Sequence, residues 1–176
     1  SIADLIVMSR PSKLRKLKFV PSNKLIVQPG VPYSPTFFNK EKNKDLQFSF
    51  IGSDTRGRGH FLSNLPLKKS EAFIRFTNRE KVVLSSYQDY CDVLQRSKIT
   101  FVNGYINPWD SLIPGRFLES IFAKSLCIVE KNLEITEFFI PYRHYIPVKN
   151  RNELIYWINY FSNHENLRKT ITNEAY

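Results

Sequence analysis

Arg116 and Glu119 are the pair of residues whose types and spacing are best suited to chemistry. They lie three apart in the segment Ile113-Pro114-Gly115-Arg116-Phe117-Leu118-Glu119, which reads as the start of a helix. Unpaired N–H groups in a helix's first turn attract anions. An arginine there can bind a phosphate, and a carboxylate one turn on can accept from two ribose hydroxyls. The pair predicts a nucleotide site. The alternative is that Glu119 complements the helix dipole and pairs with Arg116.

A second segment carries arginines beside glycines. A predicted strand at 47–51 runs into Gly52-Ser53-Asp54-Thr55-Arg56-Gly57-Arg58-Gly59. Glycines let the backbone approach a ligand closely, and Arg56 and Arg58 can neutralise a diphosphate. The spacing fits neither the dinucleotide-binding fingerprint nor the P-loop, which disfavours a dehydrogenase or an NTPase. A flexible surface turn is the alternative reading of this loop.

The elements that must position these residues alternate between strands and helices. Strands are predicted at 4–9, 24–28, 47–51, 72–76, 82–84, 98–102, 126–129 and 145–148, and helices at 11–18, 86–96, 114–124, 133–139, 153–161 and 163–173. Residues 103–111 are predicted to form an irregular loop. The fold class is therefore α/β, a Rossmann-like parallel sheet with helices on both faces. In such sheets the ligand lies at the C-terminal strand ends, where both arginine-bearing segments are expected to converge.

Packing is also predicted from helical spacing. Tyr87, Tyr90, Val93 and Leu94 are expected to point inward from the helix at 86–96. Leu118, Ile121 and Phe122 are expected to share one side of the helix that begins at Pro114.

Composition limits the partner and the compartment. The formal net charge is +10 and the pI about 9.6, which predicts an anionic partner: a phosphorylated small molecule, nucleic acid or an acidic membrane surface. Cys91 and Cys127 lack metal-ligand spacing, so we expect buried free thiols in a reducing compartment. No apolar run approaches the roughly 20 residues needed to span a bilayer, and no signal-peptide pattern opens the chain. We expect a cytoplasmic protein, with peripheral membrane contact left open.

The segment Tyr87 to Tyr176 resembles the C-terminal, nucleotide-sugar-binding domain of GT-B fold glycosyltransferases, particularly the group 1 and CgeB-like (spore maturation) families. Earlier, Phe50-Ile51-Gly52-Ser53 resembles the sequence that opens these domains. The motifs that carry the resemblance, in family order, are Ser97-Lys98-Ile99-Thr100-Phe101-Val102, Gly115-Arg116-Phe117-Leu118-Glu119, Leu126-Cys127-Ile128-Val129, Glu137-Phe138-Phe139 and Asn152-Glu153-Leu154.

Phage DNA glucosyltransferases carry a similar glycine-serine-arginine loop and a similar arginine-glutamate helix start. The two resemblances together imply that Glu119 binds the ribose of the donor, that the nucleobase lies near 81–85, and that the loop at 103–114, with Asp110 and Ser111, faces the sugar. The residues expected to bind the donor diphosphate are Gly52, Ser53, Arg56, Arg58, Gly115 and Arg116. No metal or other cofactor is expected, because enough cations can stabilise the leaving diphosphate. Ser111 stands where retaining group 1 enzymes carry a glutamate, so retention or inversion stays open.

The resemblance also divides the chain. Residues 1–30 are predicted to be the last strand and helix of an N-terminal acceptor domain with its crossover, 31–46 a linker, and 47–176 the nucleotide-sugar-binding domain. Because the chain opens on Ser1 and runs directly into an apolar segment, we expect an N-terminal part of the natural protein to be missing. No catalytic base can be named within this chain.

The predicted function is a glycosyltransferase that uses a nucleoside-diphosphate sugar, such as a UDP-sugar. Its acceptor, a glycan, a lipid-linked molecule or a nucleic acid, would be bound mainly by the N-terminal domain of the same protein. The alternative is a non-catalytic basic nucleic-acid-binding module on a degenerate GT-B domain. That alternative depends on Arg10 to Lys18, where five of nine residues are basic.

Overall fold

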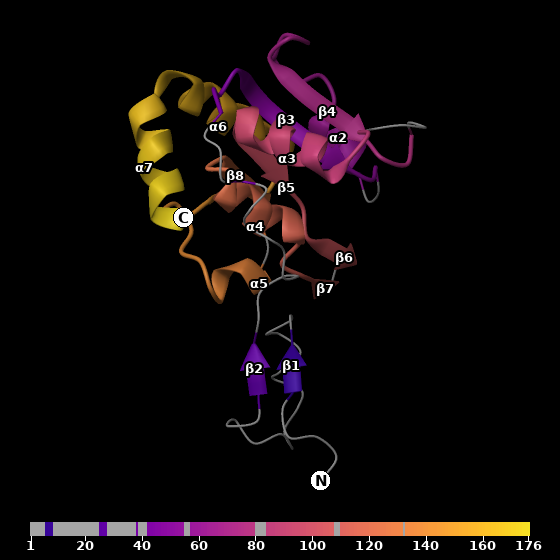
Figure 1. The fold of residues 1–176 in the computed structure, drawn as a ribbon, viewed down its shortest axis with the longest axis vertical. Coiled ribbons are helices and arrows are strands. Elements are labelled where there is room, and N and C mark those ends of the chain that lie inside the picture. Colours follow the sequence, from indigo (N-terminus) through magenta and orange to yellow (C-terminus); the bar gives the residue numbers. More distant parts are fainter. Residues whose placement is uncertain are drawn as a thin grey trace.

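A five-stranded parallel sheet forms the centre of the chain (Figure 1). The computed structural model describes residues 6–8, 25–27, 38, 42–54, 57–79, 84–107, 110–131 and 133–176. Neighbouring strands are parallel throughout, in the order β4-β3-β5-β8-β9. Their bounds are β3 Leu46–Gly52, β4 Ala72–Phe76, β5 Ser97–Val102, β8 Leu126–Glu130 and β9 Ile146–Val148. The predicted α/β class is confirmed, and Pro147 lies on an edge strand as expected.

Helices cover both faces of the sheet. Alternate residues of β8 separate the two sides, since Leu126 and Ile128 pack in one core cluster and Cys127 and Val129 in another. The first cluster holds residues of α2 (Arg58–Leu62), α6 (Arg151–Asn163) and α7 (Glu165–Ala175). The second, with a smaller third, holds residues of α3 (Tyr87–Arg96), α4 (Gly115–Phe122) and α5 (Leu133–Thr136).

Two smaller sheets accompany the central one. The strands β1 (Ile6–Met8) and β2 (Leu25–Val27) pair in parallel, as predicted from strand, helix and strand. The predicted helix at 11–18 lies outside the described residues. The predicted irregular loop after β5 is instead an antiparallel pair, β6 (Tyr105–Asn107) and β7 (Asp110–Ser111). Among the described helices, none is long and apolar enough to cross a membrane.

Several local predictions are corrected. The helix α2, which was not predicted, follows Gly57, whose φ of 80° suits a glycine. The helix α5 ends at Thr136 rather than 139, and Leu84 is not in a strand, while 82–83 lie outside the described residues.

The buried face of α4 also differs from the prediction. It consists of Phe117, Ser120 and Ile121, while Leu118 and Phe122 are only partly buried. The Phe117 ring packs edge-on against Phe139 and Tyr145, with centroid distances of 4.8 and 5.8 Å. Both partners lie more than twenty residues later in the chain, so helical spacing alone could not predict which face of α4 is buried.

Both cysteines are buried free thiols, as predicted. Burial raises the pKa of Cys91 to about 11 and that of Cys127 to about 12. Both therefore stay as unreactive thiols at neutral pH.

Candidate functional site

Arg116 crosses the C-terminal end of β3. Its Cζ lies 5.1 Å from the centre of the Phe50 ring, and its guanidinium fills the space beside Gly52. A Cβ at position 52 would lie 2.6 Å from Nη2 of Arg116, so only glycine permits this approach. Within the part of the chain that the structure describes, the buried Nε of Arg116 has no hydrogen-bond partner. The side chain is therefore positioned by packing and by its interaction with Tyr90, and the enclosed Nε leaves the terminal Nη groups to face a ligand.

Glu119 is held by two tyrosines from α3. Tyr87 Oη donates to Oε1 at 2.8 Å, and Tyr90 Oη donates to Oε2 at 2.6 Å. Burial raises the pKa of both phenols, and the nearby Glu119 carboxylate adds to the rise. The positive charge of Arg116 opposes the rise at Tyr90, but the pKa of both hydroxyls stays above its usual range, so both remain protonated donors. An ionised carboxylate has about four lone-pair positions, so two stay open to other donors.

The structure decides two predictions about these residues. Among the described residues, Arg116 and Glu119 form no ion pair, so the pairing that the alternative reading expects is not present. Its other part, in which Glu119 complements the helix dipole, stays an open reading. The prediction that Tyr87 points inward was wrong, because Tyr87 is 41% exposed while its hydroxyl reaches Glu119. Val93 and Leu94 are buried as predicted.

Arg58 joins the ends of three strands. Its Nη1 donates to both the carbonyl and the hydroxyl of Ser53, each at 3.1 Å, and its Nη2 donates to Asn103 Oδ1 at 3.2 Å. Asn103, only 5% exposed, donates in turn from Nδ2 to Glu130 Oε2. Burial raises the pKa of the Glu130 carboxyl, and the positive charge of Arg58 opposes that rise. A continuous polar network thus crosses the ends of β3, β5 and β8.

Asp54 fixes the loop that carries Arg58. Its Oδ1 accepts from the backbone N–H of Gly59 at 2.6 Å, and Oδ2 forms an ion pair with Arg79. The backbone N–H of Asp54 donates to Asn78 Oδ1 at 2.6 Å, just beyond the end of β4. A Cβ at position 59 would lie 2.8 Å from Asp54 Oδ1, so the glycine is needed for this contact. These contacts hold the two described parts of the loop, 52–54 and 57–59, against each other and against the end of β4.

The structure places most of the predicted site residues at one edge of the sheet. Gly52 ends β3 and contacts Arg116, and Ser53 directly follows and contacts Arg58. Gly115 begins α4, and Glu119 lies one turn further along it. Arg56 lies outside the described residues, as do the side chains of Asp110 and Ser111 in β7. Of the predicted nucleobase segment 81–85, only 84–85 are described.

Sequence reasoning missed three contributors to this arrangement. The roles of the Tyr87 and Tyr90 hydroxyls depend on how α3 packs beside α4, which no local pattern indicates. Glu130 did carry a signal, because it is a charged residue that directly ends the otherwise apolar segment Leu126-Cys127-Ile128-Val129. Such a residue at the C-terminal end of a parallel strand lies where ligands of these folds bind.

Most of the chain matches a known protein family. Residues 36–176 match the family described as glycosyl transferase-like. The chain belongs to this glycosyl transferase-like family. No curated protein sequence matches the chain significantly.

Solved structures identify the fold of this glycosyl transferase-like chain as the C-terminal domain of GT-B enzymes. The C-terminal domain of the group 1 family glycosyl transferase LpcC from Francisella tularensis is similar with a TM-score of 0.57 and 11% identity, over 82% of this chain and 95% of that one. Anabaena HepE in complex with UDP-glucose is similar with a TM-score of 0.61 and 12% identity, over 98% and 58%. TarM gives a TM-score of 0.61 and 10% identity, over 98% and 39%. The chain thus spans little more than half of HepE and less than half of TarM.

Proposed function

We propose that this domain binds the donor of a glycosyltransferase, a nucleoside-diphosphate sugar, at the ends of β3 and β5 and the start of α4. The observation that carries the proposal is the arrangement of Arg116 and Glu119. The guanidinium packs beside Gly52 at the end of β3, and one turn later the carboxylate is oriented by two tyrosines. The family match and the similarity to HepE, whose structure holds UDP-glucose, support the choice of ligand.

The diphosphate is assigned to the two arginine-bearing elements. Arg116 approaches from the first turn of α4, where Pro114 supplies no side-chain cap. The N–H of Phe117 donates to the Pro114 carbonyl, so the N–H groups of Gly115 and Arg116 are the ones proposed to meet an anion. Arg58, beside Ser53, would bind from the other side of the end of β3. Arg56 is proposed to assist, as its place in the loop implies. The open lone pairs of Glu119 would accept hydrogen bonds from the ribose hydroxyls.

This arrangement suits the departure of a nucleoside diphosphate. In glycosyl transfer, the bond between the anomeric carbon and the donor's phosphate oxygen breaks, and negative charge grows on the diphosphate. Cations and helix N–H groups already aimed at that position stabilise the transition state more than the ground state. We propose that the arginines supply this stabilisation without a metal, and that the acceptor and the catalytic base belong mainly to the preceding N-terminal domain.

A titration with nucleotides tests the proposal. Calorimetry with UDP-glucose, UDP, GDP and ADP should detect saturable binding of at least one nucleoside diphosphate to the wild type. Arg116→Ala and Glu119→Gln should each weaken that binding about tenfold or more, since each removes a hydrogen bond to a charged group worth roughly 1.5–3 kcal/mol. Arg143→Ala is the control, because Arg143 is an exposed arginine that pairs with Glu174 away from this site.

Two outcomes would count against the donor site. One is that none of the nucleotides binds the wild type. The other is that Arg116→Ala weakens binding no more than Arg143→Ala does. Affinity for DNA or RNA that falls steeply with salt and survives Arg116→Ala would favour the nucleic-acid-binding alternative. The segment that alternative depends on, Arg10 to Lys18, lies outside the described residues.

A further inference from the structure

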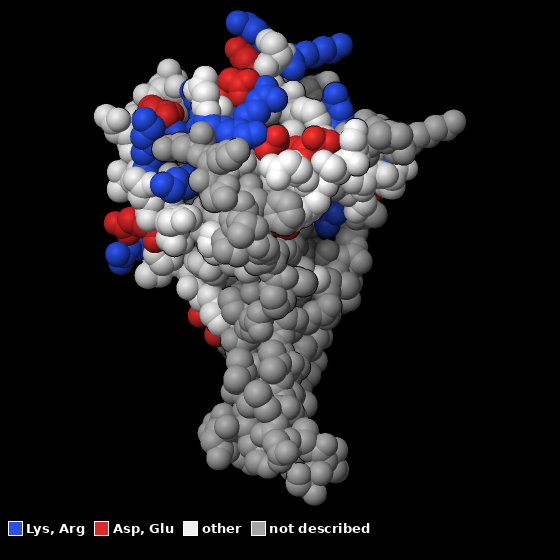
Figure 2. Space-filling model, viewed as in Figure 1, with Lys and Arg blue, Asp and Glu red and all other residues white. Residues whose placement is uncertain are grey.

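A second basic site lies at the opposite edge of the sheet. A cavity of about 580 Å³ is lined by five cationic side chains, and no aspartate or glutamate side chain occurs among the described residues that line it. The cations are Lys42, Lys44, Lys124, Arg168 and Lys169, and we call this cavity the basic pocket. Figure 2 shows lysine and arginine side chains on the flank of the molecule where α7 runs, with acidic side chains beside them.

The position of the basic pocket separates it from the donor site. Lys44 immediately precedes Asp45 and β3, Gln95 lies just before β5, and Lys124 lies just before β8, so the pocket opens at the N-terminal strand ends. Arg58 and Arg116 contact the C-terminal end of β3. The seven residues of β3 between these edges extend about 20 Å. A ligand in one site cannot touch the other.

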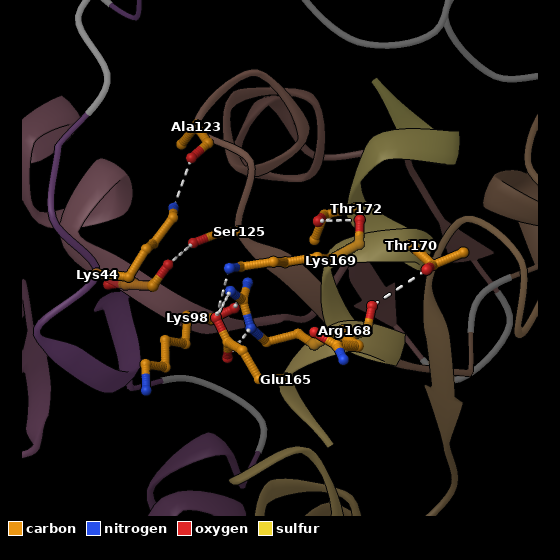
Figure 3. Close-up of polar contacts among 11 residues, drawn as sticks. Lys44, Lys98, Ala123, Ser125, Glu165, Arg168, Lys169, Thr170 and Thr172 are labelled. Carbon is orange, nitrogen blue, oxygen red and sulfur yellow. Dashed lines mark hydrogen bonds and ion pairs between the residues drawn. The ribbon is translucent and has the colours of Figure 1, made fainter. Parts of the chain in front are cut away.

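The cations are held in place around the cavity. Figure 3 shows Lys44 reaching the end of α4, where Nζ donates to the Ala123 carbonyl at 2.6 Å. It also shows Arg168 and Lys169 turned towards Glu165. Arg168 is only 2% exposed and donates to both Glu165 oxygens, at 2.7 and 3.0 Å. Such a bidentate pair holds the guanidinium in a fixed orientation at the wall of the pocket.

Among the described residues around the cavity, positive charge exceeds negative charge. Lys42 pairs with Asp92 at 2.6 Å, but the single carboxylate of Glu165 faces Arg168, Lys169 and Lys98. The hydrogen bond from Arg168 is the largest cause that holds the pKa of Glu165 below its usual range. One carboxylate cannot neutralise three cations, so the surplus is available to an anion.

A structural role for the lysines at helix ends accounts for only part of this positive charge. Lysines often complement the negative ends of helices, and α3 and α4 both end at this edge. Lys44 does contact a carbonyl at the end of α4. Lys124, in contrast, extends over the Tyr176 ring, with Nζ 5.2 Å from its centre, and Lys169 is 62% exposed. The neutral side chain of Asn173 also lines the cavity, beside Thr172, whose hydroxyl donates to the Lys169 carbonyl.

We propose that the basic pocket binds a phosphate monoester. Its volume falls within the roughly 300–1,000 Å³ typical of small-molecule sites, so it can hold a phosphate together with the small group that carries it. Lysine ammonium groups are usual partners of phosphate oxygens. The buried Arg168 adds its charge from the wall of the pocket, where its nitrogens donate to Glu165 and to the Lys98 carbonyl. The same group occurs on soluble phosphorylated molecules and on lipid headgroups, and the test distinguishes these two sources.

The soluble arm of the test uses sn-glycerol 3-phosphate, with glycerol as the blank, in calorimetry on the full chain. The lipid arm uses sedimentation with phosphatidylcholine vesicles that contain or lack phosphatidic acid, which presents the same phosphate monoester. Lys124→Glu combined with Lys169→Glu should lower the affinity at least tenfold. The control combines Lys68→Glu with Lys69→Glu, two exposed lysines outside the pocket, with the same change in charge. It should stay within about twofold of the wild type.

Each outcome either assigns the source of the phosphate or overturns the proposal. Binding in the soluble arm alone assigns a soluble phosphate, and binding to phosphatidic acid vesicles assigns a lipid headgroup. The proposal is overturned if neither probe binds, or if the control loses as much affinity as the pocket variant. It is also overturned if Arg116→Ala abolishes binding, since the phosphate would then lie in the donor site. Should the charge reversal fail to fold, Lys124→Gln with Lys169→Gln replaces it, and the same comparisons apply.

Discussion

Gly52→Ala perturbs the donor site through a single added methyl group. The new Cβ would lie 2.6 and 3.1 Å from Nη2 and Nη1 of Arg116, and 3.1 Å from Cζ of Phe50. The Phe50 ring is fully buried in the core, while the guanidinium ends a flexible side chain. The guanidinium should therefore move, and the core should be left nearly intact.

The size of the effect follows from what Arg116 would lose. A hydrogen bond to a charged group contributes about 1.5–3 kcal/mol, which corresponds to a roughly ten- to hundredfold change in affinity. We expect calorimetry to show that Gly52→Ala weakens nucleoside diphosphate binding by this factor. The free energy of unfolding should fall by only about 1 kcal/mol, because the clash is relieved by the mobile end of Arg116.

Gly115→Ala provides the matched control for stability. No atom lies within 4 Å of a Cβ added at position 115, in the first turn of α4, so this variant should be as stable as the wild type or gain up to about 1 kcal/mol. Urea denaturation compares the two variants. If Gly52→Ala bound nucleotide as tightly as the wild type, Arg116 would not be positioned by the space beside Gly52, and the reasoning would be refuted.

Two further predictions concern the residues around this site. Tyr90→Phe removes one of the two hydrogen bonds that orient Glu119, so UDP affinity measured by calorimetry should fall about three- to tenfold; an unchanged affinity would show that Glu119 needs no such support. Glu130→Gln should stabilise the fold increasingly as pH rises. The folded-state pKa of this carboxyl is raised, so its contribution to stability is present at low pH and lost as pH rises through that value. Urea denaturation at about pH 4.5 and about pH 7.5 checks this, and a stability difference between wild type and variant that does not change with pH would contradict it.

The sequence predicted those parts of the fold that depend on local patterns. The strand that ends at Gly52 and the helix that begins after Pro114 have clear apolar runs and clear glycine or proline boundaries. Parallel order followed from the alternation of strands and helices, so the order of the elements alone predicted that Arg116 and Arg58 converge on the end of β3.

The polar contacts within the candidate site could not be predicted, because they join segments that are distant in the sequence. Asn103 and Glu130 are 27 residues apart, and their contact exists because β5 and β8 are neighbours with aligned ends. Tyr90 reaches Glu119 only because α3 and α4 pack on the same face. A polar residue at the end of an element is common, and only the register of the sheet decides which other polar residue it meets. The predicted division at 1–30, 31–46 and 47–176 stays a prediction.

The most direct test of the donor site is a UDP titration of the 15N-labelled protein followed by NMR. A nucleoside diphosphate at the proposed site should shift the backbone amide signals of Gly52, Ser53, Gly115 and Arg116 in a saturable way. The amides of Lys124 and Lys169 in the basic pocket should stay unchanged. If the largest saturable shifts fell at Lys124 and Lys169 while those of Gly52 and Arg116 did not move, the central claim would be contradicted.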